Sequence, residues 1–399
     1  MDTTSSNESR RFGSALSTAP DVGEAIRDVC ERASREFDGP PDLAVLFVSA
    51  DRAGMCDQIA ADVCDRLGSD RLVGCTGESI VGMGREVEGD SALSLWLAKL
   101  PGAHVLPIRL TFERTSEGGS ILGWPDDLLD GWPEGSSLLV LGEPFSFPAE
   151  LLLEQVNEQH TSVPVIGGVA SGGAAPGENR LLFGREALAE GAVAVLLHGA
   201  VRLRTVVSQG CRPIGKHFVV TKAERNVIYE LGGKPAIAQL QAIFSELPTS
   251  EQELVNRGLH LGRVVSEYQD RFEQGDFLVR NVIGADPESG AVAVSDFVRA
   301  GQTVQFHVRD WRTADADLQQ LLAEARRTLD SPAAGALLFT CNGRGTRLFP
   351  EPHHDASAVK TALGDIPLAG FFAQGELGPV GGKNFIHGFT ASIALFEQT

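Results

Sequence analysis

Apolar residues along the chain follow two different spacings. From Asp21 to Phe37 they recur every three or four positions, which predicts an amphipathic helix that stops before Gly39. Short unbroken apolar runs such as Leu43–Ser49 are instead typical of strands buried on both faces. Residues 1–20 show neither spacing, so we expect a disordered tail before the first helix.

A composite unit occurs more than once. It consists of an apolar strand, a helix, a second strand that ends in a Gly-rich loop, and a further apolar strand. Its copies span Leu43–Ala98, Ser137–His198 and Gly335–Phe396. The wide gap between the second and third copies leaves room for a fourth, diverged copy. Since β-α-β units resemble one another in any α/β protein, duplication and local similarity both remain open. Duplication requires the same strand order in the first and third copies.

The second half of the chain adds further helices and strands. We expect helices at Pro235–Leu247, Glu251–Tyr268 and Asp315–Leu329, and strands at Asp276–Ile283, Ala291–Val294 and Thr303–Val308. The short link between the last two strands favours antiparallel pairing. The predicted fold class is α/β (mixed α+β), with two domains of mixed β-sheets flanked by helices. We expect a tail and helix at 1–39, a first domain at 40–233 and a second domain at 234–397.

Composition narrows the class of protein. The 399 residues are 43% hydrophobic, enough for a large core, and the net charge of −19 repels phosphate backbones and anionic lipid. We therefore expect neither nucleic acid nor a membrane as a partner, and no apolar run is long enough to span a bilayer. The six cysteines form no C-x-x-C pair and the N-terminus does not resemble a signal peptide, which favours a reduced, cytoplasmic protein.

Motifs for common cofactors are incomplete. The loop Asn342–Gly345 lacks the ending of a P-loop, Gly82–Gly84 lacks the third Gly of a dinucleotide fingerprint, and Ser171 lacks the first Gly of a nucleophile elbow. His353-His354-Asp355 could hold a metal, but Asp355 stands at a predicted helix start and is better interpreted as an N-cap. The sequence predicts neither a cofactor nor a metal site.

Gly-rich loops at strand ends are the candidate sites. Ligands commonly bind at strand ends in α/β sheets, because backbone N–H groups converge there. Thr76-Gly77-Glu78 and Gln374-Gly375-Glu376 match in type and in place within their copies. Two other loops, Cys341–Gly345 and Gly210–Gly215, each combine a thiol with a guanidinium group. The alternative is that all these loops are structural turns.

Several motifs, in a fixed order, resemble one known family. The end of the FIST N domain is similar to Ser208–Gly215, Val219–Thr221 and Glu230–Ala236. The FIST C domain is similar to Phe277–Arg280, Ala285-Asp286, Gly301, Arg309-Asp310, Cys341–Gly345, Gly370–Pro379, Asn384 and His387–Thr390. The match covers roughly residues 40–397. One departure is Ala373-Gln374 before Gly375, where we expect a Cys or another small residue at the first position.

The resemblance implies a sensory module of signal transduction that binds a small ligand, amino acids being the usual suggestion. Relatives in this family are fused to output domains. Only about 40 residues precede the first apolar strand here, and they are accounted for by the predicted tail and helix. We therefore expect a stand-alone sensor that acts through a signalling protein partner.

An amino acid needs an anion receptor and a cation receptor close together. Arg344 offers a guanidinium group for a carboxylate, and Glu376 offers a carboxylate for an ammonium group. Because strands linked by one helix lie side by side, their end loops should meet at one edge. The predicted ligand site contains Cys341, Asn342, Arg344, Gln374 and Glu376, with Cys211 and Arg212 from the first half of the chain.

Two other functions remain open. An enzyme would use Cys341 or Cys211 as its nucleophile, activated by Arg344 or Arg212, with Glu376 as a general acid or base. No His accompanies either Cys in the sequence, which weakens this alternative. An interaction scaffold would instead expose a large apolar patch and have no pocket.

Overall fold

The structure is a computed structural model that describes residues 11–115, 118–129, 131–268, 272 and 275–398. Contacts between segments divide the chain into two compact units. Unit 1 contains the chain up to residue 207, together with 318–386 and the segment from 390 onward. Unit 2 contains 208–317 and 387–389, so its sequence interrupts that of unit 1. The domain boundaries expected from the sequence stay predictions, because units defined by contacts do not test them.

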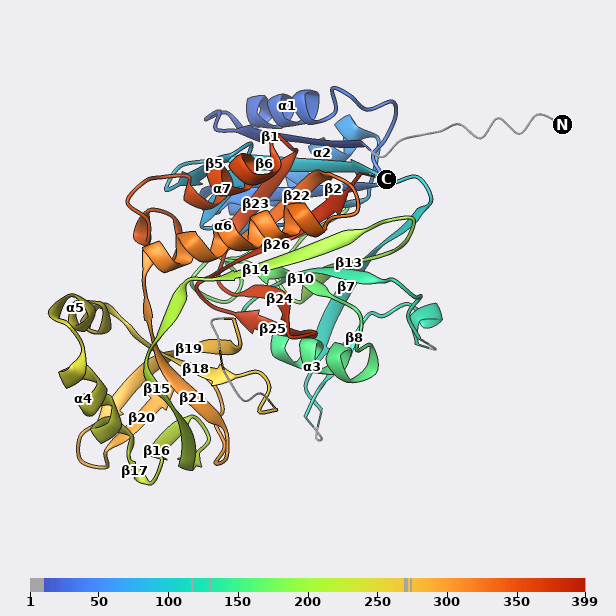
Figure 1. The fold of residues 1–399 in the computed structure, drawn as a ribbon. Helices are drawn as coiled ribbons and strands as arrows, with labels where there is room; N and C mark the ends of the chain where they lie inside the picture. Colours follow the sequence, from blue (N-terminus) through green and yellow to red (C-terminus); the bar gives the residue numbers. More distant parts are fainter. Residues whose placement is uncertain (1–10, 116–117, 130, 269–271, 273–274, 399) are drawn as a thin grey trace. The chain divides into compact units, whose positions relative to one another are not determined.

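Three mixed β-sheets form unit 1 (Figure 1). Sheet 1 has the order β1 (Arg11–Ser17), β6 (Leu93–Lys99), β2 (Leu43–Ser49), β3 (Leu72–Gly77), β11 (Leu181–Phe183), β12 (Glu186–Leu188). Sheet 2 has the order β25 (Lys383–His387), β24 (Glu376–Val380), β10 (Val165–Val169), β9 (Ser137–Gly142), β13 (Ala192–Gly199), β7 (Ala103–Glu113), β8 (Ser120–Leu122). Sheet 3 has the order β14 (Leu203–Gln209), β26 (Thr390–Glu397), β22 (Ala333–Cys341), β23 (Leu368–Ala373), β4 (Ser79–Gly82), β5 (Arg85–Glu88).

The strand order is the same in all three copies of the composite unit. In each copy the first strand pairs in parallel with the second and antiparallel with the last. These pairs are β2 with β3 and β6, β9 with β10 and β13, and β22 with β23 and β26. The mixed α/β fold class is confirmed, and the first and third copies share the strand order that duplication requires.

Each copy contributes a hairpin to the sheet of another copy. The hairpin β4–β5 of the first copy extends sheet 3, β11–β12 of the second extends sheet 1, and β24–β25 of the third extends sheet 2. Every one of these hairpins pairs antiparallel with the second strand of the sheet that it joins. The exchange is cyclic, so the three copies close on one another in a pseudo-threefold arrangement.

Alternation along the strands separates a central core from outer ones. The odd-numbered residues 43–47 of β2 face a central cluster that also contains residues of β9 and β22. The even-numbered residues 44–48 pack under α1 (Val22–Ala33) and α2 (Cys56–Leu67). In the same way α3 (Ala149–Gln159) covers sheet 2, and α6 (Trp311–Thr328) with α7 (His354–Leu363) covers sheet 3 (Figure 1).

Three glycines mark equivalent positions in the three copies. Gly74, Gly167 and Gly370 are each the third residue of a second strand. A Cβ atom added to them would lie 2.0, 1.9 and 1.9 Å from a carbonyl oxygen of the neighbouring first strand. Only glycine permits so close an approach. These positions therefore align the three copies residue by residue.

Unit 2 is built on an antiparallel sheet. Its strand order is β15 (Cys211–Glu224), β21 (Thr303–Arg309), β18 (Leu259–Val264), β19 (Phe277–Asp286), β20 (Ala291–Val294), β16 (Val227–Leu231), β17 (Lys234–Pro235). The helices α4 (Ala236–Glu246) and α5 (Thr249–Arg257) follow β17 in the chain. Within the described residues, the sequence between the second and third copies forms this sheet and not the fourth copy for which the spacing leaves room.

Three local predictions are also wrong. Residues 11–17 form β1 and not a tail, because Phe12 and Leu16 enter the central core, whereas residues 1–10 lie outside the described part. The helix predicted at Glu251–Tyr268 ends at Arg257, after which β18 begins. The strands β20 and β21 do not pair with each other, because β16 and β19 flank the first, and β15 and β18 flank the second.

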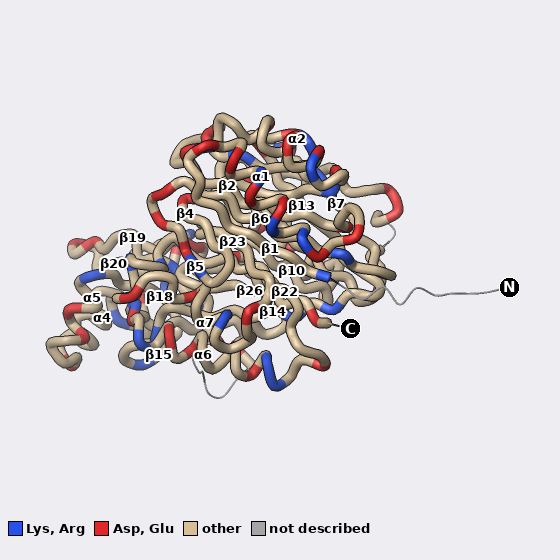
Figure 2. Tube along the Cα trace, turned by 90° about the horizontal axis from the view of Figure 1, so that it is seen from above, with Lys and Arg blue, Asp and Glu red and all other residues tan. Residues whose placement is uncertain are grey.

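Most acidic and basic positions of unit 1 lie on helices, turns and strand ends (Figure 2). Some charged side chains are nevertheless buried in this unit, namely Arg52, Glu86, Glu143, Arg344, Asp355, Glu376 and Glu397. An unpaired charge in the interior is costly. Each of these groups therefore needs a partner, a shifted pKa or a ligand.

Candidate functional site

The second strands of the three copies end at a common junction in unit 1. Ser171 N donates a hydrogen bond to Thr76 O at 3.2 Å, and Gln374 N donates to Val169 O at 3.0 Å. In the alignment of the copies these two bonds are equivalent. They tie the end of each second strand to the end of the preceding copy's second strand.

The equivalent link between the first and third copies runs through a side chain. Glu78 N donates to Ser171 Oγ at 2.9 Å, and the same hydroxyl donates to the carbonyl oxygen of Phe372. Ser171 therefore closes the junction that the backbone alone leaves open. Its role in this structure is a structural bridge between all three copies.

Glu376 is the exception in the alignment of the hairpins. Each aligned glycine of a second strand is followed by a residue that pairs with a hairpin of another copy. These pairs are Phe371 with Ile80, Cys75 with Leu181, and Gly168 with Glu376, so the three hairpin residues are equivalent. Ile80 and Leu181 belong to the central hydrophobic cluster. A carboxyl group that replaces an aliphatic side chain at 0% exposure is unfavourable for stability alone, and such departures are typical of functional sites.

The surroundings of Glu376 leave one of its oxygens unused. Oε2 accepts hydrogen bonds from Thr390 N at 3.2 Å and from Thr390 Oγ1 at 2.7 Å. Oε1 is buried and has no hydrogen-bond partner among the described residues. The Cys341 thiol lies close enough to the carboxyl group to lower its pKa. Burial raises the pKa of Glu376 to about 8, although the bonds from Thr390 oppose this shift.

The loop after β22 lies beside the loop after β23, as expected from the parallel pairing of these strands. Asn342 N donates to Ala373 O at 2.9 Å across the two loops. Asn342 Oδ1 is buried and has no partner among the described residues. Gln374 is exposed at the rim. We call Cys341, Asn342, Gln374, Glu376 and Thr390 the strand-end site.

Arg344 does not point its guanidinium group to an open cleft. Its Nε donates to Asp355 Oδ2 at 2.7 Å and its Nη2 donates to Asp355 Oδ1 at 2.8 Å. Both side chains are at most 1% exposed. Burial alone would raise the pKa of Asp355, but the guanidinium group holds it below its ordinary value. The predicted carboxylate receptor is therefore occupied by a carboxylate of the protein.

Asp355 is not the N-cap of α7, because the helix is preceded by His353 and has no side-chain cap. Its carboxylate instead accepts from Thr340 Oγ1 at 2.5 Å and contacts His354 Nδ1 at 2.9 Å. The His354 ring stacks at 3.4 Å on Phe349. This buried network fixes the loop 342–353 that carries Asn342, so Arg344 acts on the site by positioning it.

Arg347 links the first copy to the strand-end site. It forms an ion pair with Glu78 and donates from Nη1 to Asn342 O at 2.9 Å. The two charged side chains are 57% and 37% exposed, so the ion pair contributes little to stability. It places one guanidinium group at the rim of the site.

Cys211 and Arg212, the predicted contributors from the first half, belong to unit 2. Cys211 is 1% exposed and begins β15 opposite Arg309. Arg212 forms ion pairs with Asp310 at 3.3 Å and with Glu251 at 3.2 Å. Their membership in the ligand site stays a prediction.

Four other thiols are structural. Burial raises the pKa of Cys30 and Cys56 to about 12 and that of Cys64 to about 11, and it raises the pKa of Cys75 well above its ordinary value. A thiol that stays protonated is a poor nucleophile. These four cysteines therefore behave as small core residues.

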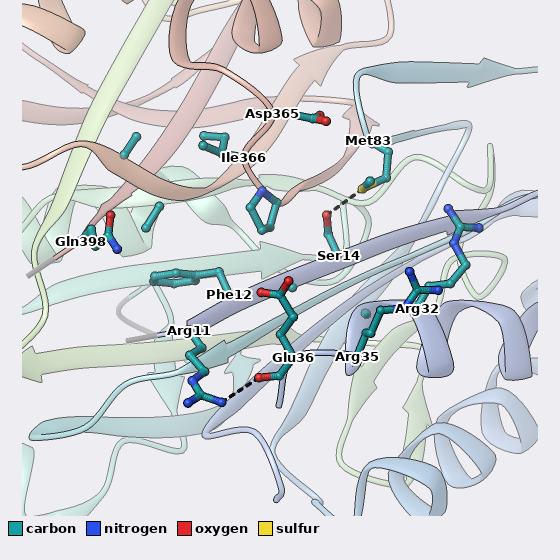
Figure 3. A pocket seen from close by; sticks show the side chains of 15 residues that line it. Arg11, Phe12, Ser14, Arg32, Arg35, Glu36, Met83, Asp365, Ile366 and Gln398 are labelled. Atoms are coloured by element: carbon teal, nitrogen blue, oxygen red, sulfur yellow. Dashed lines mark hydrogen bonds between the residues drawn. The ribbon is translucent and has the colours of Figure 1, made fainter. Parts of the chain in front are cut away.

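Three cavities formed by described residues of unit 1 have linings that contain none of the residues of the strand-end site. One of about 530 Å³ is lined by Arg11, Ser14, Arg32 and Met83, and Figure 3 shows Arg11 bonded to the main chain of Glu36. It lies where β22 and β23 begin, the opposite end from their Gly-rich loops. A second, of about 610 Å³, is lined by β5 and the loop before α7. A third, of about 240 Å³, contains Trp124 and Trp132.

Sequence comparison of the copies misaligns the Gly-rich loops by two residues. It matches Glu78 with Glu376, whereas the aligned strands make Glu78 equivalent to Gln374 and Ile80 equivalent to Glu376. The residues missed by sequence reasoning are Thr390, Asp355 and Arg347. The other two copies have an apolar residue at this place, Ile80 and Leu181. A correct alignment of the copies would therefore have shown Glu376 as the exception.

These features define a class of protein: three α/β copies closed by exchanged hairpins, with an antiparallel unit whose main segment lies between the second and third copies in the sequence. The FIST N domain matches residues 42–234 and the FIST C domain matches residues 236–379. The chain belongs to the FIST family, whose domains are associated with sensory signal transduction.

Curated relatives match along almost the whole chain. "Uncharacterized protein Rv0628c" of Mycobacterium tuberculosis is 45% identical over 387 residues, which is 97% of this chain and 99% of the relative. "Uncharacterized protein Mb0898c" of Mycobacterium bovis is 42% identical over 387 residues, covering 97% of this chain and 98% of the relative. Among the described residues, no helix is long and apolar enough to cross a membrane.

Proposed function

We propose that this protein is a sensor that binds a small metabolite, an amino acid or a similar compound, at the strand-end site of the third copy. The observation that carries the proposal is the buried Glu376, whose Oε1 has no partner among the described residues. Asn342 Oδ1 provides a second buried acceptor without a donor. An ammonium group would supply donors to such acceptors, and this supports a ligand that carries an amine.

The carboxylate of an amino acid would need other partners than Arg344, because Asp355 occupies that guanidinium group. The groups available at the rim are the amide of the exposed Gln374 and the guanidinium group of Arg347, which is 57% exposed. In the proposal, Arg344 keeps its place in the site as a positioning residue, and Cys211 and Arg212 remain candidate contributors from unit 2.

Burial of the two acceptors connects ligand binding to a change in conformation. A ligand reaches them only if the loop 342–353 or the hairpin that begins at Glu376 moves aside. A ligand that binds an opened state shifts the population toward that state, which is what a sensor needs. We propose that a signalling protein partner reads this change.

The proposed location is the cytoplasm. All six cysteines are buried thiols and none of them forms a disulfide. Reduced cysteines are typical of proteins in a reducing compartment. Fractionation of cells, with detection of the protein in each fraction, would test the location directly.

A metabolite screen tests the proposed function. The purified full chain is mixed with amino acids and related amines, and the melting temperature is measured by thermal shift, with calorimetry on each positive compound. A ligand at 100 times its Kd should add about 2.7 kcal/mol of stability. If no amine-bearing metabolite changes the melting temperature, the proposal loses its support.

The alternative function is an enzyme with Cys341 as nucleophile, and one contact favours it. The Cys341 thiol lies beside the Glu376 carboxyl group, which would accept the thiol proton when it is ionised. Iodoacetamide labelling as a function of pH, compared between wild type and Cys341→Ser, tests this. Labelling of Cys341 well below pH 8.5 would support the enzyme, and ordinary reactivity would exclude it.

A further inference from the structure

The cavity of about 610 Å³ in unit 1 is lined by three segments that are distant in the sequence. They are the link between β1 and α1, the strand β5 with the turn after it, and the loop before α7. Its carboxylate side chains are Glu86, Glu88 and Asp90, whereas Arg85 is the one Arg or Lys in the lining. The lining is therefore acidic on balance, which favours a cation as ligand.

Glu86 is a buried member of this lining, and one of its two carboxyl oxygens has no partner among the described residues. It is 3% exposed, and its Oε1 accepts from Ala356 N at 2.9 Å. Its Oε2 is buried and has no hydrogen-bond partner among the described residues. Burial first, and then the charge of Asp355, make a negative charge at Glu86 unfavourable and raise its pKa, although the backbone N–H groups of Ala356 and Asp355 oppose this shift. A cationic donor would satisfy the orphaned oxygen and offset this repulsion.

The neighbouring groups are already held in place. Glu88 accepts from Thr346 N at 3.1 Å and from Thr346 Oγ1 at 2.7 Å, which orients its carboxylate. Glu86 N donates to His353 Nδ1 at 3.0 Å, so a neutral imidazole carries its proton on Nε2. His353 has a φ of +64°, a left-handed conformation that is unfavourable for a residue with a side chain. Strain of this kind clusters at ligand sites.

We propose that this cavity binds a small aliphatic diamine, with Glu86 Oε2 accepting from one ammonium group and Glu88 facing the other. Alternate residues of a strand share a face and lie about 6.6–6.8 Å apart, a distance that a four-carbon chain spans. Pro20 and Pro352 add apolar surface for the methylene groups. A metal ion fits less well, because no group of three His, Cys, Asp or Glu among the described residues is placed to ligate one.

This site goes beyond the proposed function, and the two can fail independently. The strand-end site is built on Glu376 and Asn342, and neither residue lines this cavity. The two sites share only the loop 342–353, which begins beside Cys341 and ends at the cavity wall. Glu376→Gln should therefore leave diamine binding unchanged.

Calorimetry and thermal shift with putrescine on the full chain test the proposal. We expect saturable binding, with a Kd weakened about tenfold or more in Glu86→Gln and unchanged in Glu143→Gln, a control at another buried carboxylate. Sodium chloride and magnesium chloride at the same ionic strength should not reproduce the stabilisation. Equal stabilisation by either salt, or unchanged binding in Glu86→Gln, would overturn the proposal.

A second measurement does not depend on the folding of the variant. Glu86 is protonated in the free protein at neutral pH, because burial raises its pKa to about 8. Binding of a diamine should expel about one proton, so the heat of binding to wild type should change with the ionisation heat of the buffer. If putrescine gives no heat of binding, or if the heat is the same in phosphate and Tris buffers, the role of Glu86 is contradicted.

Discussion

Ile80 in the first copy and Leu181 in the second fill the position that Glu376 fills in the third. The strand pairing at all three positions is the same, because each residue lies opposite the second strand of another copy's sheet. Two copies use the position to extend the central hydrophobic cluster, and the third places a carboxyl group there. The comparison separates residues that maintain the shared architecture from the residue that we propose serves a ligand site in one copy.

The largest expected effect concerns the glycines that all three copies share. Gly370→Ala would place a Cβ 1.9 Å from Leu338 O, and Gly167→Ala one at the same distance from Val140 O. Both variants should lose more than about 4 kcal/mol or fail to fold, as measured by denaturant unfolding. The control is Gly54→Ala, whose Cβ has no neighbour within 4 Å. If one of the two glycines tolerates alanine, the copies are not equivalent there.

The buried ion pair of the third copy should be the next most sensitive feature. Arg344→Met leaves Asp355 buried without its guanidinium partner, which should lower the free energy of unfolding by about 3–5 kcal/mol. The double variant Arg344→Met with Asp355→Leu should recover most of that loss. Chemical denaturation of both variants measures this. A single variant as stable as wild type would show that Arg344 is not a positioning residue.

The exceptional carboxyl group should also appear in the pH dependence of stability. Burial raises the pKa of Glu376 from 4.5 to about 8, so the folded state retains a proton that the unfolded state releases. The free energy of unfolding should therefore fall as pH rises from about 4.5 to about 8, by at most about 4–5 kcal/mol from this group. Glu376→Gln should remove this part of the slope. Parallel pH curves for wild type and variant would contradict the shift.

The smallest expected effect lies at the junction of the three copies. Ser171→Ala removes the hydroxyl that joins Glu78 N to Phe372 O, and we expect a loss of about 1–2 kcal/mol. The matched control is Ser245→Ala, which removes an exposed hydroxyl bonded within α4. Thermal unfolding compares the two variants. An equal, negligible loss in both would show that the backbone closes the junction without Ser171.

Much of the fold could be predicted from the sequence, because the repeated strand–helix–strand units depend on local apolar patterns. The β1 strand was missed because Phe12 and Leu16 are separated by small and polar residues, and only tertiary contacts bury them. The end of α5 was missed because Leu259–Val264 has apolar residues that also fit a helix. Exchange of hairpins between copies leaves no local signal at all.

The candidate site was predictable only in part, for a related reason. Parallel pairing brings the loops after β22 and β23 together, and this follows from the order of elements in the sequence. The ion pair between Arg344 and Asp355 does not follow from the sequence, because Asp355 also fits the pattern of a helix N-cap. Which of the two roles a carboxylate takes depends on burial, and burial here depends on α7 packing over sheet 3.

The central claim is that Glu376 is present for a ligand and not for the fold. Its most direct test is calorimetric titration of the best amine-bearing metabolite into wild type, Glu376→Gln and Glu143→Gln. The Gln variant keeps the shape and the acceptor for Thr390 but cannot lose a proton to become the carboxylate that an ammonium group needs, so we expect folded protein without measurable binding. Glu143→Gln changes a carboxylate whose oxygens already bond to protein groups, and it should bind like wild type. Wild-type affinity in Glu376→Gln would contradict the account.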